Sequence, residues 1–362
     1  MKKQRNTPIG SINRRKFVKY GTLILGSAVV SACTGDRQAS TNSSPASSQT
    51  ASSPAIVGKT EKVIASWLPI MQTTAYYVAL EEKLFEKAGI EIESVKFENP
   101  NQIIDSLLSG RADFGPPGTP AGIIILAESR ASGAFKVFGL QGGGIKSNFI
   151  NDGLIVKIDS SITSFKDLAG KKVGVIPGIQ GKTITQYILR QNGLDPEKDV
   201  RLEQMAVGLH LASVVSGAVD ATLSLEPVGS IAVATKQGKR AITNPVSMFI
   251  SDPFYSGAAV LSSKFLKERP EVAKLVVQVI DEATKMANDN FDKYRPTLAK
   301  YTAIKPDQAA YIAQPRLRSF SDLDETDINS YQKLVDVFYK EGALKKAMDV
   351  HSIILDKSQL PA

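Results

Sequence analysis

Hydrophobic and polar positions follow two different periods along residues 62–288, and their alternation predicts an α/β protein. Short apolar or alternating runs are typical of strands, whereas apolar residues that recur every three or four positions are typical of helices. The predicted strands are 62–67, 90–97, 112–114, 172–176, 200–202 and 219–225. The predicted helices are 74–88, 102–109, 182–191, 211–216 and 272–288. We expect the proline-rich segment 116–120 to end the third strand.

Two stretches share a short signature, which predicts two similar lobes. Residues 107–114 are Leu-Leu-Ser-Gly-Arg-Ala-Asp-Phe, and residues 214–221 are Val-Val-Ser-Gly-Ala-Val-Asp-Ala. Each contains a predicted helix end, a glycine and an aspartate that opens a strand. Because both occupy the matching place in a βαβαβ pattern, we expect an internal duplication. Two such α/β lobes would bind ligands between the carboxyl ends of their strands.

The first 58 residues differ in pattern and predict an export signal followed by a tether. Arg14 and Arg15 lie in a basic segment before the apolar run 21–32, which is shorter than the roughly 20 residues of a membrane-spanning helix. The arginine pair resembles a twin-arginine signal, and residues 30–33 resemble a lipobox ending in Cys33. We expect a signal peptide over 1–32, then a lipidated Cys33 in a flexible serine-rich linker over 33–58. The alternative is an ordinary buried cysteine.

Charge and composition remove several classes of function. The net charge is +8, but residues 1–58 hold eight basic residues and one acid, whereas the other 304 residues hold 36 basic and 35 acidic residues. A folded domain that binds nucleic acid needs a basic excess, so we expect no nucleic-acid partner. With one cysteine and two histidines, His210 and His351, no metal site or cofactor is expected, and both histidines are interpreted as structural.

Residues 176–183 partly match a phosphate-binding loop. Gly181, Lys182 and Thr183 fit the end of that pattern, but Ile176 stands where its first glycine belongs. We therefore expect no nucleotide-hydrolysing site. A helix that starts after a strand still offers free backbone N–H groups to a ligand, and the alternative is a plain turn capped by Thr183. The candidate ligand contacts of this loop are Gly178, Gln180, Gly181 and Thr183.

Other candidate ligand residues lie beside loops that follow predicted strands. For the threonines the alternative is helix capping, for the tryptophan it is core packing, and for the glutamate it is a solvated loop or a salt bridge. The glycine-rich segment 141–147 suits either an anion-binding backbone nest or a flexible crossover between lobes. These further candidates are Trp67, Thr73, Thr74, Tyr76, Gly118, Thr119, Glu226 and the possible aromatic wall Tyr255.

In order and spacing, four segments resemble the substrate-binding proteins of ABC importers, especially binders of sulfonate, taurine, nitrate, bicarbonate and thiamine-pyrimidine precursors. The resemblance implies a two-lobed periplasmic-binding-protein fold of type II, hinged by two chain crossings. It implies lobe one over 60–148 plus 250–362 and lobe two over 149–249, with ligand loops at 73–76, 118–119, 178–183 and Glu226. The segments that carry it are 79–92, 108–115, 165–175 and 217–227.

The same resemblance implies a function without catalysis. The chain would capture a small anionic or aromatic/heterocyclic solute by lobe closure and deliver it to a permease with ATPase subunits. We expect a monomer on the periplasmic or cell-surface side, held by its lipid anchor. Residues 179–181 are Ile-Gln-Gly where sulfonate binders carry small hydroxyl residues, which is a departure from that pattern. Two alternatives remain: a ligand sensor for a membrane receptor, and a pyrimidine-precursor synthase-like enzyme, whose Cys-rich motif this chain lacks.

Overall fold

The computed structural model describes residues 60–361, which fall within one compact unit, Ile56–Ala362. The predicted signal peptide, the lipidation at Cys33 and the linker lie outside the described residues. Within residues 60–361, no helix has both the length and the apolar character needed to span a membrane. The same residues contain no group of histidine, cysteine, aspartate and glutamate side chains suited to a metal ion.

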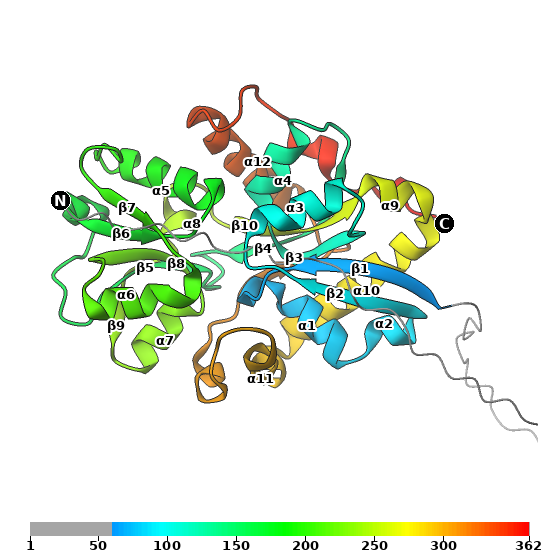
Figure 1. Ribbon diagram of the computed structural model, residues 1–362, viewed down its shortest axis with the longest axis horizontal. Helices are drawn as coiled ribbons and strands as arrows, with labels where there is room; N and C mark the ends of the chain where they lie inside the picture. Colours follow the sequence, from blue (N-terminus) through cyan, green and yellow to red (C-terminus); the bar gives the residue numbers. More distant parts are fainter. Residues whose placement is uncertain (1–59, 362) are drawn as a thin grey trace, which may run out of the picture. The chain divides into compact units, whose positions relative to one another are not determined.

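Two separate sheets form the framework of the described unit (Figure 1). The first sheet contains β1 (Glu61–Trp67), β2 (Ile90–Lys96), β3 (Phe114–Pro120), β4 (Phe135–Gly143), β10 (Phe254–Ser262) and β11 (Arg316–Arg318). The second contains β5 (Asp152–Lys157), β6 (Lys172–Val175), β7 (Arg201–Gln204), β8 (Ala221–Leu225) and β9 (Gly238–Thr243). The strand orders are β11-β4-β10-β3-β1-β2 and β7-β6-β8-β5-β9, and both sheets mix parallel and antiparallel pairs.

Helices pack on both sheets, and α12 (Glu325–Lys340) contacts elements of both lobes. The helices are α1 (Thr74–Glu81), α2 (Leu84–Lys87), α3 (Pro100–Leu108), α4 (Ala121–Glu128), α5 (Ile179–Gln191), α6 (His210–Ser216), α7 (Val228–Ala234), α8 (Pro245–Phe249), α9 (Ser263–Glu268), α10 (Pro270–Asp289), α11 (Phe291–Tyr301) and α12 (Glu325–Lys340). The long helix α10 begins at a proline, which suits the first helical position because its missing N–H would have no partner there. Helix α12 contacts α4 and β10 of the first lobe and α5 of the second.

The chain passes between the sheets twice, from β4 to β5 and from β9 to β10. The two crossings are tied together by side chains. The Asp252 carboxylate accepts hydrogen bonds from the backbone N–H groups of Ile145 at 2.8 Å and Lys146 at 3.1 Å. Asn244 Oδ1 accepts one from the backbone of Asn151 at 2.9 Å. Two sheets joined by two crossings confirm the predicted fold class, while the lobe boundaries stay a prediction.

The repeated sequence signature has the same structural role in both lobes. Asp113 Oδ2 accepts a hydrogen bond from the backbone N–H of Ile64 in β1 at 2.9 Å. Asp220 Oδ2 accepts one from the backbone N–H of Lys172 in β6 at 2.8 Å. Each aspartate also donates its own backbone N–H to the carbonyl of the same residue. The aspartates therefore fix where β3 joins β1 in the first sheet and where β8 joins β6 in the second.

Three predicted element boundaries are wrong, and two of them lie in the first sheet and its helices. The predicted helix 74–88 is divided, because Lys83 adopts a left-handed conformation with φ of 54° between α1 and α2. The segment 116–120 does not end the third strand but forms most of β3. The pairing of β3 with β10 shifts register between Ala258 and Val260, opposite the prolines. Because prolines lack the N–H that a regular ladder uses, such an irregular stretch accommodates them.

A third boundary changes the meaning of Gly181. Helix α5 begins at Ile179, three residues earlier than predicted, so Gly181 lies in its first turn rather than in a loop. A Cβ atom on Gly181 would lie 2.3 Å from the carbonyl oxygen of Ile176. The glycine therefore lets the start of α5 pack closely against the end of β6. The sequence analysis explained the glycine at position 181 by contact with a ligand. The close packing of α5 on the end of β6 already requires a glycine at that position.

Candidate functional site

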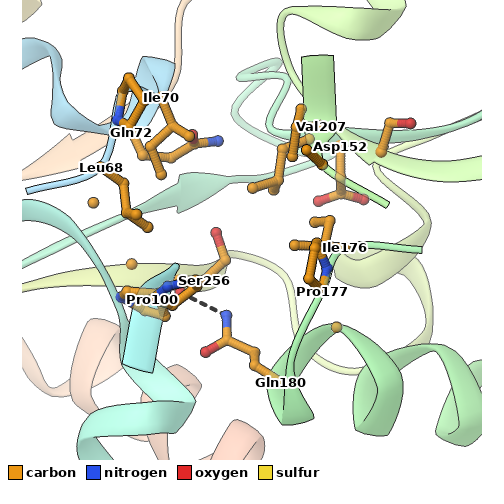
Figure 2. Close-up of a pocket in the computed structure, with 18 of the residues that line it drawn as sticks. Leu68, Ile70, Gln72, Pro100, Asp152, Ile176, Pro177, Gln180, Val207 and Ser256 are labelled. Atoms are coloured by element: carbon orange, nitrogen blue, oxygen red, sulfur yellow. Dashed lines mark hydrogen bonds between the residues drawn. The ribbon is translucent and has the colours of Figure 1, made fainter. Parts of the chain in front are cut away.

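A cleft with a volume of about 800 Å³ lies between the two sheets (Figure 2). One side is formed by the loop after β1, the ends of β3 and α11, and part of β10. The other side is formed by the start of β5, the loops after β6 and β7, and the end of β8. The volume lies in the range of small-molecule sites, roughly 300–1,000 Å³. The cleft therefore has the size and position of a binding site at strand carboxyl ends.

Most of the cleft wall is apolar. Leu68 and Ile70 face the cleft from the first lobe, and Ile176 and Val207 face it from the second (Figure 2). Val246, Phe254 and Leu223 add further apolar surface. Such walls favour a solute with an organic body, because burial of its apolar surface contributes about 25 cal/mol per Å².

Gln180 at the start of α5 connects the second lobe to the first (Figure 2). Its Nε2 donates to the carbonyl of Ser256 in β10 at 2.9 Å, and its Oε1 accepts from the backbone N–H of Gly122 in α4 at 2.7 Å. Both partners are backbone groups with fixed donor or acceptor character, so they determine the orientation of the amide. Gln180 therefore bridges the lobes through two satisfied hydrogen bonds.

A second polar chain crosses the cleft at the hinge. Gln72 Nε2 from the first lobe donates to Asn151 Oδ1 at 2.9 Å. Asn151 Nδ2 in turn donates to Asp152 Oδ2 at 3.0 Å and to Ser256 Oγ at 3.3 Å. Gln72 Oε1 is buried, and within the described residues it has no hydrogen-bond partner. Gln72, Asn151, Asp152 and Ser256 all line the cleft, so this chain, unlike the Gln180 bridge, ends in an unused acceptor.

Asp152 is a buried carboxylate in the cleft wall. Its side chain belongs to a residue that is only 2% exposed, and its Oδ1 accepts from the backbone N–H of Val246 at 3.1 Å. Burial raises the pKa of Asp152 to about 6, although the hydrogen bonds from Val246 and Asn151 oppose the rise. The negative charge of Glu226 adds to the rise in this pKa. Asp152 is thus a carboxylate without a cationic partner among the groups that bond to it.

The cations that line the cleft are both in ion pairs. Lys96 Nζ lies 3.4 Å from Glu98 Oε1, and Lys300 forms an ion pair with Glu81. Both lysine side chains are more than half exposed, at 53% and 62%, so they belong to the cleft mouth. Among the described residues, no arginine lines the cleft. Within residues 60–361, the deep part of the site therefore offers a solute acceptors and apolar surface but no cationic side chain.

His210 lies beneath the cleft floor rather than in it. The residue is fully buried, with its Nδ1 2.7 Å from Ser224 Oγ and its Nε2 3.0 Å from the carbonyl of Met205. Burial lowers the pKa of His210 to about 4, so the ring is neutral at pH 7. Both ring nitrogens are engaged within the lobe, which leaves neither for a solute.

Three of the predicted ligand residues line the cleft: Gly118, Gln180 and Gly181. Gly118 adjoins the loop after β1, and a Cβ there would lie 2.5 Å from Thr73 Oγ1. The role of Gln180 and Gly181 in ligand contact stays a prediction, because their visible interactions are the lobe bridge and helix packing. Gly178 lies just outside the lining as the residue before α5, and its backbone N–H donates to Gln204 Oε1 at 2.8 Å.

The predicted hydroxyl and carboxylate contacts are occupied elsewhere. Thr73 Oγ1 donates to the carbonyl of Leu68 at 3.0 Å, Thr74 Oγ1 to that of Met71 at 2.5 Å, and Thr119 Oγ1 to that of Pro116 at 2.9 Å. Thr183 is buried within α5. None of these four threonines is part of the cleft lining, so we leave them out of the proposed site.

Glu226 is likewise held within its own lobe. Its Oε1 lies 2.7 Å from Arg240 Nη2, and its Oε2 accepts the backbone N–H of Ser230 at 3.0 Å. The residue is 1% exposed and does not line the cleft. An intramolecular salt bridge was one of the sequence alternatives for Glu226, although from the facing lobe rather than from the same one.

The predicted aromatic wall belongs to the hydrophobic core. Trp67 Nε1 donates to Ser94 Oγ at 2.8 Å, and its ring packs edge-on against Tyr77 at 5.5 Å. Tyr76 is fully buried and donates to the same Ser94 Oγ at 2.9 Å. Tyr255 is also fully buried and bonds to Asp327, while Arg316 Nε donates to its hydroxyl at 2.7 Å. Burial is the main cause that raises the pKa of both tyrosines.

The aromatic residues that do line the cleft are Tyr301 and Phe254. Tyr301 stacks on Tyr77 with ring centroids 4.7 Å apart. Sequence reasoning missed them, together with Gln72, Asn151 and Asp152. It searched the loops that follow strands, whereas Asp152 opens an antiparallel strand and Tyr301 ends a helix. The position of Asn151 and Asp152 shortly after the glycine-rich segment 141–147 is the signal that could have found them.

Comparison with known proteins adds family information to this geometry. The family described as NMT1/THI5 like matches residues 70–293. A Bacillus subtilis (strain 168) protein named for aliphatic sulfonates binding is 27% identical over 277 residues, which cover 75% of this chain and 79% of that protein. A 4-amino-5-hydroxymethyl-2-methylpyrimidine phosphate synthase of Saccharomyces cerevisiae (strain S288c) is 24% identical, covering 62% of this chain and 66% of the synthase.

Solved structures share the fold. The periplasmic aliphatic sulphonate binding protein SsuA of Escherichia coli superimposes with a TM-score of 0.65 at 18% identity. The match covers 81% of this chain and 97% of that protein. At this identity the likeness concerns the fold, and it agrees with the two sheets and two crossings described above.

Proposed function

The chain belongs to the NMT1/THI5-like family, and on that premise we propose that it is the extracytoplasmic solute-binding component of an ABC import system. It captures a small solute between its lobes and passes it unchanged to a permease with ATPase subunits. The observation that carries this proposal is the cleft of about 800 Å³, which takes its walls from both lobes of a fold hinged by two crossings.

Closure by hinge motion follows from the bonds that cross the cleft. Rotation about the two crossings would separate Gln180 from Ser256 and Gly122, and Gln72 from Asn151. Hinged lobes that close on a ligand are a general device of two-lobed binders. Each cross-lobe hydrogen bond replaces bonds to water and contributes only about 1 kcal/mol net. A bound solute would supply the remaining stabilisation of the closed form.

The walls favour an organic solute among the types that the resemblance implies. Relatives are named for aliphatic sulfonates and for a pyrimidine phosphate, so both anionic and heterocyclic solutes are candidates. Nitrate and bicarbonate are too small to cover walls such as Leu68, Ile70 and Ile176 in so large a cleft. We therefore rank nitrate and bicarbonate below organic compounds as candidate solutes.

The N-terminal segment supports an extracytoplasmic place for the protein. We propose that residues 1–32 direct export in a twin-arginine manner, that Cys33 carries the lipid, and that 33–58 tethers the solute-binding unit to the membrane. The protein would act there as a monomer on the periplasmic or cell-surface side. Replacement of Cys33 by serine should release the chain from the membrane fraction, and retention there would contradict the anchor.

Catalysis is a second candidate, because one relative is named as a synthase. We propose that this chain is not an enzyme. Both ring nitrogens of His210 are occupied within the lobe, and the single cysteine, Cys33, lies in the predicted lipidation motif. Asp152 could exchange a proton with a solute, but among the described residues that line the cleft there is no histidine or cysteine to act with it as a second acid–base group or a nucleophile. A sensor for a membrane receptor would use the same cleft, and co-purification with a permease would favour import over sensing.

Thermal-shift screening of the purified chain tests solute capture. The panel contains alkane- and arenesulfonates, nitrate, bicarbonate, pyrimidines, aromatic acids and aromatic amides. A true solute at a hundred times its Kd should raise the free energy of unfolding by about 2.7 kcal/mol. The solute recovered after denaturation should have an unchanged mass. Chemical turnover of the bound compound would favour the enzyme, and stabilisation by no compound would contradict solute capture.

A further inference from the structure

We propose that the cleft selects an organic solute that carries no net negative charge and donates N–H hydrogen bonds to the Asp152 carboxylate and the Gln72 amide oxygen. The inference rests on the proposed solute-binding function and specifies the class of solute. It separates this chain from relatives named for sulfonates.

The hydrogen bonds of the Gln72–Asn151–Asp152 chain run in one fixed donor-to-acceptor direction. The Asp152 carboxylate is an acceptor, so the nitrogen of the Asn151 amide faces it at 3.0 Å. That orientation turns Asn151 Oδ1 toward Gln72, and Gln72 must present its nitrogen there, at 2.9 Å. The Gln72 oxygen is consequently the free end of the amide. A carboxylate thus fixes an unpartnered acceptor on the opposite lobe.

Gln72 Oε1 and the Asp152 carboxylate both have unused capacity to accept hydrogen bonds. Gln72 is 1% exposed, and its Oε1 has no partner within the described residues. A buried polar atom without a partner costs roughly the desolvation energy of that atom, so a donor from the solute would relieve the cost. Asp152 accepts one hydrogen bond on each oxygen, whereas an ionised carboxylate has about four lone-pair sites. Both residues line the cleft, so unused acceptor capacity is available on both lobes.

The charges around Asp152 oppose an anionic solute. An anionic head group beside Asp152 would meet a carboxylate that has no cationic partner, and Glu226 raises the negative potential further. Arg240, which could offset it, is bound to Glu226 and is outside the lining. The lining lysines, Lys96 and Lys300, are at the mouth and already ion-paired. Within the described residues, the deep cleft therefore opposes a sulfonate and suits a neutral or cationic N–H donor on an apolar body.

Matched probes that share one apolar body test this selectivity on the full chain. Benzamide and benzamidine are compared with benzenesulfonate, and hexanamide with hexanesulfonate, by calorimetry and thermal shift. We expect the amide and amidine probes to bind at least about tenfold more tightly than their sulfonate partners, which is the loss expected when one charge-assisted hydrogen bond is replaced by repulsion. Tighter binding of the sulfonates would overturn the inference while leaving solute capture intact. Binding of none of the five probes would overturn the inference and would also count against solute capture.

Variants locate the selectivity. Asp152→Asn should weaken benzamide at least about tenfold and narrow the gap to benzenesulfonate. The matched control Asp159→Asn, at an exposed side chain of the same lobe that pairs with Lys157, should change neither affinity. Because Asp152 also accepts from the backbone of Val246, its replacement could unfold the lobe, and Gln72→Met provides an independent arm. Gln72→Met removes the free acceptor on the other lobe, and unchanged benzamide affinity in that folded variant would overturn the role of Gln72.

Discussion

Two glutamines reach across the same cleft in opposite directions, and they differ in what they leave unsatisfied. Gln180 extends from the second lobe, and both ends of its amide bond to backbone groups of the first lobe. Gln72 extends from the first lobe, and only its nitrogen has a partner, Asn151. A fully satisfied amide can hold the lobes together without help from a solute. An amide with a free buried oxygen gains only when a donor arrives, so we assign closure to Gln180 and solute recognition to Gln72 and Asp152.

The largest expected effect comes from displacing the first turn of α5, which carries Gln180. In Gly181→Val the new Cβ would lie 2.3 Å from the carbonyl oxygen of Ile176, so the first turn of α5 must move. We expect a loss of about 3 kcal/mol in the free energy of unfolding, at the upper end for overpacking, and a loss of solute affinity. Denaturant unfolding measures the first quantity and calorimetry the second.

Gly208→Ala is the control for that change. Gly208 lines the same cleft, but a Cβ there meets nothing within 4 Å. The free energy of unfolding should stay within about 0.5 kcal/mol of the parent value. A Gly181→Val protein as stable as Gly208→Ala would contradict the close packing of α5 on β6.

The next largest effect is the pH dependence that Asp152 gives to the free energy of unfolding. Its folded pKa of about 6 lies above its ordinary value of 3.8, so it contributes stability below pH 3.8 that is lost as the pH rises through 6. At about 1.4 kcal/mol per pKa unit, the loss between pH 4 and pH 7 is about 2 to 3 kcal/mol. His210 acts oppositely, because its folded pKa of about 4 lies below 6.5, so its contribution grows as the pH rises. The wild-type profile alone would therefore hide the effect of Asp152.

The difference in the free energy of unfolding between Asp152→Asn and the wild type isolates the contribution of Asp152. Relative to the wild type, Asp152→Asn should gain about 2 to 3 kcal/mol in the free energy of unfolding between pH 4 and pH 7. Asp159→Asn should follow the wild-type profile. Glu226, whose charge adds to the rise in the pKa of Asp152, and its partner Arg240 are present in both proteins. A pH-independent difference between Asp152→Asn and wild type would contradict a buried, raised carboxyl.

A smaller effect tests the bridge itself. Gln180→Glu replaces the Nε2 donor by a carboxylate oxygen opposite the carbonyl of Ser256. We expect the affinity for the best compound of the screen to fall about tenfold, equivalent to about 1.4 kcal/mol, because the closed form loses a hydrogen bond and gains repulsion. Gln191→Glu, at the exposed end of the same helix, is the control that adds the same charge. Equal affinities in the two variants would remove Gln180 from closure.

The smallest effect should fall outside both glutamine systems. Tyr76→Phe removes the hydroxyl that donates to Ser94 in the core. We expect a loss of about 1 kcal/mol in the free energy of unfolding, typical of one hydrogen bond, and no change in solute affinity. A clear loss of affinity measured by calorimetry would return Tyr76 to the binding site.

The sequence predicted the two-lobed fold because its evidence is periodic and local. Asp113 and Asp220 are recognisable in the sequence, and they join β3 to β1 and β8 to β6 respectively. The failures have physical causes that are not local. Pro116 and Pro117 fit in β3 only because its pairing with β10 is irregular, and that irregularity belongs to a partner strand far along the chain.

The site was harder to predict than the fold. Gln180 was found because it follows a strand and starts a helix, but its partners in β10 and α4 come from the other lobe. Trp67 and Tyr255 were proposed as cleft walls because their loops are nearby, yet they are core residues that bond to Ser94 and Asp327. Asp152 was missed because it opens a strand, whereas the candidates were sought in loops that follow strands. Its carboxylate is held by Asn151 and by Val246, and Val246 lies far along the chain.

Small-angle X-ray scattering of the purified chain with and without its best solute tests lobe closure most directly. We expect the radius of gyration to decrease when the solute binds, and we expect Gln180→Glu, which lacks the bridge, to show a smaller decrease at equal occupancy. A radius of gyration that stays the same in the wild type while calorimetry shows the site filled would contradict closure of two hinged lobes around the solute.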